Sequence, residues 1–294
     1  MSIAPRKPPA QLLKWVGNKQ RMAPLIVGSF PRDFNTYYEP FLGSGAVLGA
    51  LAPDSAVASD ALKPLIDIWQ MLVDAPDELI GAYDFYRSQL ERGVDKAAVY
   101  REALDRFNIS RDSCAFIFLT RACYGGIVRF RKADGYMSTP VGAHVPISTE
   151  SFAQRVTAWR ECISGTKFSH MDYREAFELP NAGDLVYCDP PYVDTQKILY
   201  GAQSFDFMDL VERIRDAKDR GVFVALSIDG SKRNGKHQIH LDLPEGLFET
   251  EVAVSVGKSM LRRFQLGGSV LDGEHVTDRL LLTYSPEPGK DTLF

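Results

Sequence analysis

A short motif, Asp189-Pro190-Pro191-Tyr192, carries residue types that suit chemistry on a planar group bearing an NH2. It follows an apolar, β-preferring run over residues 184–188, which predicts a buried strand that ends in a loop. In open α/β sheets, ligands bind at this carboxyl edge. Each proline fixes its own φ and lacks an N–H, so a stiff loop presents a carboxylate, carbonyl acceptors and an aromatic face. Four residues alone are more often an ordinary turn with a solvated aspartate, so the rest of the chain has to decide.

A glycine-rich turn is the second candidate. Residues 36–40 predict a strand, residues 46–51 predict a helix, and the turn between them contains Gly43 and Gly45. Glycines let the backbone approach a ligand closely, and the start of the helix offers unpaired N–H groups. The spacing differs from G-x-G-x-x-G and the chain has no G-K-[ST] motif, so a dinucleotide or triphosphate site is not favoured.

Two further candidates lie close to this turn in the sequence. Asp60 closes a second short strand, 56–60, where an acid typically binds the hydroxyls of a ribose. It could equally cap the helix that follows, and both roles can hold at once. Lys14, Trp15 and Lys19 surround a glycine and could bind an anionic or planar ligand. Taken alone, a surface turn is the commoner arrangement for such residues.

The composition is that of an ordinary soluble globular protein, with 294 residues, 45% of them hydrophobic, and a net charge of -4. We find neither an apolar run of the roughly 20 residues that span a membrane nor a signal peptide, so we expect a cytoplasmic protein without membrane association. The four cysteines lack a C-x-x-C pair. The histidines show no ligand pattern beyond the close pair His237 and His240, so we expect no metal.

A different pattern interrupts the chain between the second strand and residue 155. Residues 64–75, 77–89, 96–107 and 113–123 predict successive amphipathic helices. Residues 124–136 then predict a β-hairpin with an Ala-Asp-Gly turn. Its basic residues alternate with aromatic ones, a composition typical of nucleic-acid contacts, although a solvated face is more common for such a cluster alone. The cluster comprises Arg121, Tyr124, Arg129, Phe130, Arg131, Lys132 and Tyr136.

The α/β pattern resumes after the insertion. We expect strands at 166–169, 184–188 and 222–227, and closing strands at 248–256 and 279–284 that form an antiparallel pair. The fold class is therefore α/β, a Rossmann-like sheet with helices on both faces. We expect a discontinuous catalytic domain over residues 1–61 and 156–294, and a mostly helical insertion with a hairpin over residues 62–155.

Taken in order, these motifs resemble the Dam-like (D12 class, alpha-group) DNA adenine-N6 methyltransferases. The resemblance spans residues 13–284 and is carried by Lys14-Trp-Val-Gly-Asn-Lys19, Glu39-Pro-Phe-Leu-Gly-Ser-Gly45, Asp60, the hairpin and Asp189-Pro-Pro-Tyr192. It implies site-specific transfer of a methyl group from S-adenosylmethionine to the exocyclic amino group of adenine in duplex DNA, with the base flipped out. It makes double-stranded DNA the partner and allows a cognate restriction endonuclease as another. The oligomeric state stays open.

The resemblance also implies a role for each residue on the cofactor side. Trp15 and Lys19 would bind S-adenosylmethionine, Lys19 through the carboxylate of the cofactor. The segment from Glu39 to Gly45 would hold the methionine part, and Asp60 would accept the ribose hydroxyls. Asp172 would accept a hydrogen bond from the amino group of the cofactor's adenine. The implied cofactor-binding set is Trp15, Lys19, Glu39, Gly43, Gly45, Asp60, Asp172 and Asp189.

On the substrate side, the resemblance makes Asp189, Pro190 and Tyr192 the catalytic residues. Asp189 and the Pro190 carbonyl would each accept one N–H of the target adenine, and Tyr192 would stack on the base. Held this way, the amino nitrogen aims its lone pair at the methyl group without a covalent enzyme intermediate. We therefore expect Cys188 to be a buried strand thiol and not a nucleophile.

In the insertion, the resemblance implies direct DNA contacts. Tyr124 matches an intercalating tyrosine of the family, Arg129 a base-contacting arginine and Lys14 a lysine that can read a neighbouring base pair. The family often has Asn-Gly where this chain has Gly125-Gly126, so the recognition sequence stays open, with GATC as a guess. The implied DNA-binding set is Lys14, Arg121, Tyr124, Arg129 and Arg131.

Three other functions remain open. An amino methyltransferase acting on cytosine in DNA or on adenine in RNA would use the same chemistry around Asp189. A catalytically silent DNA-binding module with the same fold is opposed by the intact Asp189, Asp60 and Lys19. A nucleotide-dependent oxidoreductase is opposed by the missing glycine fingerprint.

Overall fold

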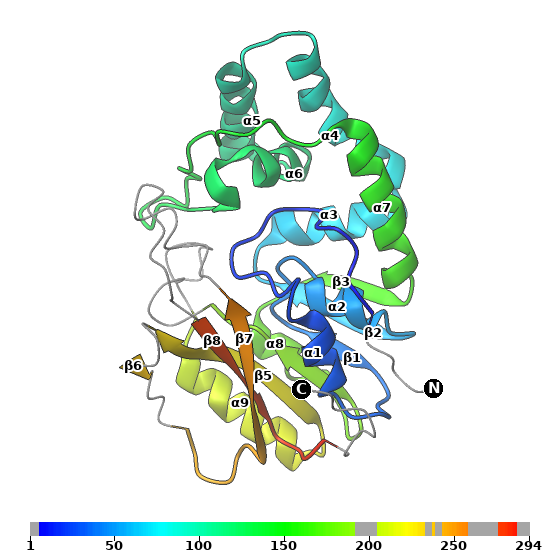
Figure 1. The fold of residues 1–294 in the computed structure, drawn as a ribbon, viewed down its shortest axis with the longest axis vertical. Helices are drawn as coiled ribbons and strands as arrows, with labels where there is room; N and C mark the ends of the chain where they lie inside the picture. Colours follow the sequence, from blue (N-terminus) through cyan, green and yellow to red (C-terminus); the bar gives the residue numbers. More distant parts are fainter. Residues whose placement is uncertain (1–5, 192–204, 233–236, 239–242, 258–275, 287–294) are drawn as a thin grey trace.

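A computed structural model describes residues 6–191, 205–232, 237–238, 243–257 and 276–286 of the chain. Within these residues, eight strands form one sheet in the order β3-β2-β1-β4-β5-β8-β7, with β6 paired to β5 (Figure 1). The strands are β1 (Tyr37–Glu39), β2 (Ala56–Asp60), β3 (Thr166–His170), β4 (Leu185–Cys188), β5 (Phe223–Lys232), β6 (His237–Gln238), β7 (Thr250–Gly257) and β8 (Val276–Leu282).

The sheet has a parallel part and an antiparallel part. Strands β3, β2, β1, β4 and β5 are parallel, whereas β8 is antiparallel to both β5 and β7. This confirms the predicted Rossmann-like sheet and its antiparallel closing pair, although β8 begins earlier than expected, at Val276. Because β8 is antiparallel, its start lies at the edge where the parallel strands end. That edge gathers residues from distant parts of the sequence.

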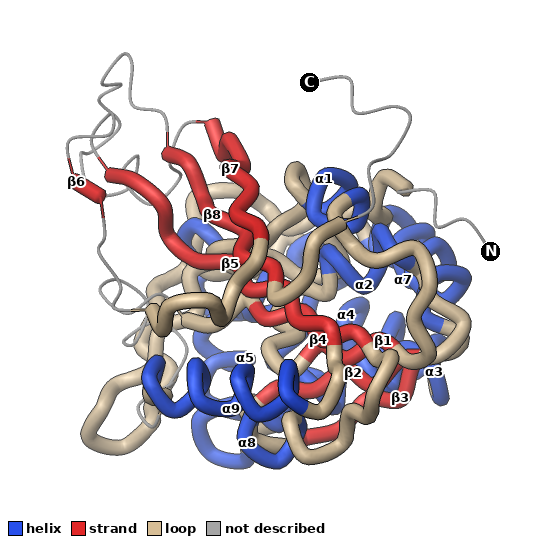
Figure 2. Tube along the Cα trace, turned by 90° about the horizontal axis from the view of Figure 1, so that it is seen from below, coloured by secondary structure: helices blue, strands red, loops and turns tan. Residues whose placement is uncertain are grey.

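The sequence of β4 is continuously apolar because both of its faces are buried. Leu185 and Tyr187 belong to the core that includes helices α1 (Ala23–Gly28) and α2 (Ala46–Leu51), whereas Val186 and Cys188 belong to a second core with α9 (Phe207–Asp219). Alternate residues of a strand point to opposite faces, and both faces of this sheet are covered by helices (Figure 2). Cys188 is fully buried, as its expected role as a strand thiol requires.

The chain between β2 and β3 forms a helical lobe, drawn above the sheet in Figure 1. Helix α6 is its most buried helix, with every residue from Ala115 to Ala122 inaccessible to solvent. Asp95, Asp112 and Ser148 accept backbone N–H groups at the starts of three helices and so fix where those helices begin. The helices are α3 (Lys63–Asp74), α4 (Pro76–Glu91), α5 (Lys96–Ser110), α6 (Ser113–Ala122) and α7 (Thr149–Ile163). In the described ranges, no helix is long and apolar enough to cross a membrane.

The lobe and the sheet share aromatic packing. Helix α7 runs through the boundary expected at residues 155 and 156, because it continues from Thr149 to Ile163. Trp159 on α7 packs edge-on against Trp69 on α3, with ring centroids 5.0 Å apart. Trp69 in turn stacks on Phe168 of β3 at 5.8 Å. The side chains on either side of the expected boundary therefore belong to one continuous core.

The hairpin of the lobe is shorter than the sequence predicts. Its two strands pair antiparallel at the bridge between Phe130 and Met137. The first part of the expected strand is instead a 3-10 turn, η1 (Tyr124–Gly126). The reason is the backbone of Gly125 and Gly126, whose φ angles of 64° and 69° take the chain out of the extended conformation.

Candidate active site

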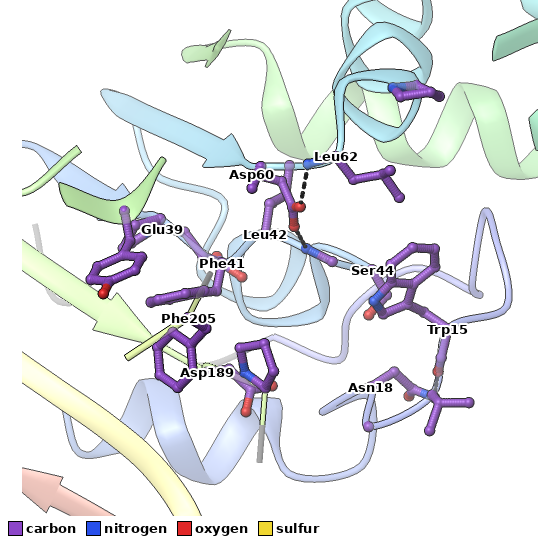
Figure 3. A pocket seen from close by; sticks show the side chains of 18 of the residues that line it. Trp15, Asn18, Glu39, Phe41, Leu42, Ser44, Asp60, Leu62, Asp189 and Phe205 are labelled. Carbon is purple, nitrogen blue, oxygen red and sulfur yellow. Dashed lines mark hydrogen bonds between the residues drawn. The ribbon is translucent and has the colours of Figure 1, made fainter. Parts of the chain in front are cut away.

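The carboxyl edge of the sheet contains a cavity of about 500 Å³ (Figure 3). Glu39 ends β1, Asp60 ends β2 and Asp189 directly follows β4, so the parallel strands deliver three acids to one place. Trp15 and Lys19 reach the cavity from the segment that precedes α1. The expected cofactor-side residues that line the cavity are Trp15, Lys19, Glu39, Gly43, Asp60, Asp172 and Asp189.

The glycine turn after β1 comes close to two tryptophans. Gly43 has a φ of 49°, and a Cβ added there would lie 3.1 Å from the indole of Trp15. Gly45 has a φ of 64°, and its added Cβ would lie 3.1 Å from Trp69. Both the backbone conformation and the available space therefore favour glycine at these positions. Gly43 lines the cavity, whereas Gly45 is not among the described residues that line it and packs against Trp69.

Asp60 holds this turn against the start of α3. Its Oδ2 accepts the Gly43 N–H at 3.1 Å, and its Oδ1 accepts the Leu62 N–H at 3.0 Å (dashed lines in Figure 3). Burial raises the pKa of Asp60, and these hydrogen bonds oppose the rise. Asp60 does not cap α3, whose N-cap residue Leu62 has no side-chain cap. Each carboxylate oxygen has a second lone pair, so the two hydrogen bonds of Asp60 still leave acceptor capacity for a ribose.

Lys19 lies between two carboxylates. It is only 4% exposed, and its ammonium lies 2.8 Å from Oδ1 of Asp189 and 3.6 Å from Oδ2 of Asp278. Burial alone would lower the pKa of Lys19, but the two acids outweigh this effect and raise it. The ammonium that the resemblance assigns to the cofactor carboxylate thus makes ion pairs within the protein. No motif in the sequence pointed to Asp278, which lies within a strand.

Glu39 is a buried acid at the cavity wall. It is 3% exposed, and its Oε2 accepts a hydrogen bond from the Tyr37 hydroxyl at 2.7 Å. Burial raises the pKa of Glu39 to about 8, with a further contribution from the charge of Asp189. Glu39 is therefore mostly protonated at neutral pH in the free protein. A cation that enters the cavity would favour its ionised form.

Three aromatic rings form one side of the site. Phe41 stacks on Tyr173 with centroids 5.4 Å apart and meets Phe205 edge-on at 5.8 Å. The Tyr173 hydroxyl donates to Oδ2 of Asp209 at 2.5 Å, which fixes its ring. All three rings line the cavity and offer flat apolar surface to a planar ligand. The sequence analysis did not identify Phe205, and it included Phe41 only as part of the segment from Glu39 to Gly45, without a role of its own. The position of Phe41 inside the motif that starts at Glu39 was the available signal.

Of the remaining residues expected at this edge, some line the cavity, one is buried and one lies outside the described residues. Asp172 lines the cavity and caps the short helix α8 (Tyr173–Ala176), because its Oδ1 accepts the Arg174 N–H at 2.9 Å. Pro190 is buried and Pro191 lines the cavity. Tyr192, expected to stack on the target base, lies outside the described residues.

Arg121 does not lie with the expected DNA contacts on the surface. Its side chain is 4% exposed, and its Nη1 donates to the carbonyls of Gln11 and Leu12 at 2.9 and 2.8 Å. Burial lowers the pKa of Arg121 to about 10. We therefore correct its expected role, because the guanidinium is used inside the protein. It ties the centre of the lobe to the segment that carries Lys14 and Trp15.

The other expected DNA contacts lie at or near the surface of the lobe. Tyr124 is 41% exposed, and Arg129 and Arg131 are also exposed. Arg131 pairs with Asp134 at 2.6 Å on the same turn. Lys14 is half-buried against η1, since a Cβ added at Gly126 would lie 2.7 Å from the Lys14 Cβ.

The hairpin also reaches the cavity. Phe130 and Lys132 line the cavity together with Arg111, which follows α5. The Arg111 Nη2 donates to the Gly135 carbonyl at 2.6 Å and so fastens the hairpin turn to that helix. The lobe with its basic, aromatic hairpin and the acidic sheet edge therefore border the same space.

The fold and the site are consistent with a Rossmann-like methyltransferase: a glycine turn follows β1, one acid ends β2 and another directly follows β4. Residues 15–241 match the model of the D12 class N6 adenine-specific DNA methyltransferase family. The match covers well over half of the chain, and the chain belongs to this family. The expected enzyme class, adenine-specific DNA methylation, is thereby confirmed.

Individual relatives agree with the family. The chain is 27% identical over 231 residues to the "Type II methyltransferase M1.LlaDCHI" of Lactococcus lactis subsp. cremoris, covering 74% of this chain and 80% of the relative. It is 25% identical to the "DNA adenine methylase" of Haemophilus influenzae, covering 67% and 68%. It is 28% identical to the "Type II methyltransferase M.MjaIII" of Methanocaldococcus jannaschii, covering 70% and 77%.

Proposed function

We propose that this chain transfers the methyl group of S-adenosylmethionine to the exocyclic amino group of an adenine flipped out of duplex DNA. The observation that carries the proposal is one shared cavity. It contains Asp189, which can hold the amino group, and also Gly43 and Asp60, which can hold the methyl donor. The two reactants can therefore meet at the carboxyl edge of the sheet without movement of either strand end.

The residues of the cavity fit S-adenosylmethionine. The backbone of Gly43 approaches Trp15 so closely that a Cβ there would lie 3.1 Å from the indole, and Asp60 keeps acceptor capacity for ribose hydroxyls. Phe41 and Phe205 offer flat surfaces for an adenine ring, and Glu39 can balance a positive charge. When bound, S-adenosylmethionine supplies an electrophilic methyl group whose former bonding electrons stay on sulfur, while the amino nitrogen gains an N–C bond and releases one proton.

The protein's own residues would orient the amino group. Asp189 retains 19% exposure at the cavity, and its carboxylate can accept one N–H of the target adenine. We propose the carbonyl of Pro190 as the second acceptor, since Pro190 lies between Asp189 and Pro191, both of which line the cavity, and the proline rings stiffen this loop. Two accepted hydrogen bonds fix the plane of the amino group and favour a lone pair directed at the methyl group. Extraction of the base from the duplex costs about a few kcal/mol.

We further propose double-stranded DNA as the partner and the hairpin as the reading element. Tyr124 and Arg129 lie on the lobe whose hairpin borders the cavity, and Lys14 lies against Gly126 of that lobe. Arg131 would add a phosphate contact. Relatives named as type II methyltransferases support a cognate restriction endonuclease as a further partner, and those named as DNA adenine methylases support an independent role. A protein that modifies DNA works where the DNA is, so we expect it in the cytoplasm.

The test is methylation of plasmid DNA from an unmethylated host, with modified bases mapped by sequencing. The wild-type chain should produce N6-methyladenine within one recognition sequence. Asp189→Asn should reduce the rate by a factor of about 100 or more while S-adenosylmethionine still binds. Asp216→Asn, the same change on the exposed face of α9, is the matched control. Methylated cytosine, methylation of RNA alone, or an undiminished rate in Asp189→Asn would refute the proposal.

A further inference from the structure

Lys19 receives its two carboxylates from different strands of the sheet. Asp189 follows β4, and Asp278 lies near the start of β8. Because β8 is antiparallel to β5, its start lies at the edge where β4 and β5 end. The ammonium lies 2.8 Å from Oδ1 of Asp189 and 3.6 Å from Oδ2 of Asp278. The antiparallel part of the sheet thus contributes a charge to the catalytic edge.

Hydrogen bonds hold the backbone of Lys19 as well as its side chain. Its carbonyl accepts the N–H groups of Met22 and Ala23 at 2.9 and 2.8 Å, at the start of α1. The ammonium also donates to the Gly17 carbonyl at 3.3 Å. An ammonium has three donors, and oxygens from three parts of the chain set its direction here. A change at any of these oxygens would alter where the ammonium points.

Two carboxylates share the single positive charge of Lys19. Side-chain exposures are 4% for Lys19, 19% for Asp189 and 8% for Asp278, so water screens the three groups only weakly. An ammonium paired with Asp189 alone would neutralise the acceptor that an incoming amino group needs. Sharing the ammonium with Asp278 leaves more of the negative charge of Asp189 directed at the cavity. Lys19 and Asp189 both line the cavity, whereas Asp278 is absent from the described residues that line it.

We propose that Asp278 is a positioning residue for methyl transfer. It fixes the Lys19 ammonium and shares its charge, so that Asp189 meets the target amino group in one orientation and with most of its negative charge. The proposal rests on the function proposed above, because it concerns how Asp189 receives that amino group.

The first experiment separates rate from binding. Asp278→Asn should lower kcat by a factor of about 10 to 100, because a small displacement of a catalytic group is costly. KM for DNA and the Kd for S-adenosylmethionine should stay within about threefold of the wild type. Asp278→Glu, which keeps a carboxylate, should recover most of the rate. Glu251→Gln is the matched control, since it removes one negative charge from the adjacent strand, where Glu251 pairs with Arg279 at 2.6 Å.

The second experiment asks whether Asp278 acts through Lys19. In a Lys19→Gln background, Asp278→Asn should cause no further loss of kcat, because the ammonium that it positions is gone. Urea unfolding of the same four proteins should show coupling between the two positions, independently of activity. Asp278→Ser is the second neutral variant if the asparagine variant does not fold.

The outcomes distinguish the two proposals. Three results would overturn the positioning role and leave the proposed function intact. Asp278→Asn could lower kcat equally in the wild-type and Lys19→Gln backgrounds, it could change only KM, or it could keep the wild-type kcat. A wild-type chain that fails to methylate adenine in DNA would overturn the proposed function, and the positioning role with it.

Discussion

Glu39→Gln tests the charge state of the cavity. Burial raises the pKa of Glu39 to about 8, and the variant keeps an acceptor for the Tyr37 hydroxyl at 2.7 Å. A carboxyl group with this pKa is ionised in about one tenth of free molecules at pH 7. A bound ligand with a sulfonium and an ammonium favours the ionised form. Binding at pH 7 should therefore release most of one proton from Glu39 in the wild type, and Glu39→Gln should lack this proton release.

The same linkage fixes the pH dependence of affinity. The ionised fraction of such a group rises about tenfold or more between pH 6 and pH 7.5. The affinity of the wild type for S-adenosylmethionine should therefore increase by up to about this factor relative to the variant. Titration of the ligand itself is common to both proteins, so the ratio of the two affinities isolates Glu39.

The free energy of unfolding should change with pH in the opposite direction to the affinity for S-adenosylmethionine. The folded-state pKa of about 8 lies above the ordinary value of 4.5, so the folded protein binds this proton more tightly than the unfolded chain. The free energy of unfolding thus falls as pH rises from about 4.5 to 8, by up to about 5 kcal/mol. Glu39→Gln removes this contribution, so the variant should gain stability relative to the wild type as pH rises.

Calorimetry in two buffers of different ionisation enthalpy measures the proton release directly, and urea unfolding at pH 5 and pH 8.5 measures the stability trend. Glu251→Gln, an exposed acid on β7, is the control and should behave as the wild type in both. Equal proton release from the wild type and Glu39→Gln would refute the reasoning, because the titrating group would then lie elsewhere.

Two further changes test the lobe. Arg121→Met should lower the free energy of unfolding by about 1–3 kcal/mol in urea denaturation, because the carbonyls of Gln11 and Leu12 lose their buried donor; a stability unchanged from the wild type would argue against its internal role. Arg129→Ala should relax or weaken sequence choice, with a discrimination loss of about 1–3 kcal/mol at one base pair, seen as methylation of near-cognate sites in sequencing. An unchanged site preference would remove the hairpin from the reading mechanism.

The site residues that can be predicted from the sequence are polar residues that stand at the end of an apolar run or directly after it. Glu39, Asp60 and Asp189 each stand at the end of a strand, and parallel strands end at one edge, so their convergence follows from the pattern. The order of these motifs also identified the family. Helices α3 to α6 could be predicted from their helical periodicity, and Asp95 and Asp112 cap two of them, whereas α7 was not predicted.

The contacts that the sequence could not reveal join segments without a local signal. Asp278 becomes part of the catalytic edge only because β8 enters the sheet from that side. Arg121 belongs to a basic cluster in the sequence, but α6 is buried all round, and its guanidinium turns inward to backbone carbonyls. Phe41 and Phe205 are ordinary apolar residues until the fold places them against Tyr173.

The contact between Gly126 and Lys14 bears on attempts to change sequence choice by exchanging hairpins. A side chain at position 126 would begin 2.7 Å from the Lys14 Cβ, where the φ of 69° already disfavours any residue except glycine. A hairpin transplanted from a relative would therefore displace Lys14 unless it keeps that glycine. The unit to exchange is the hairpin together with residues 11–15, two pieces of chain more than a hundred positions apart that have to change as one.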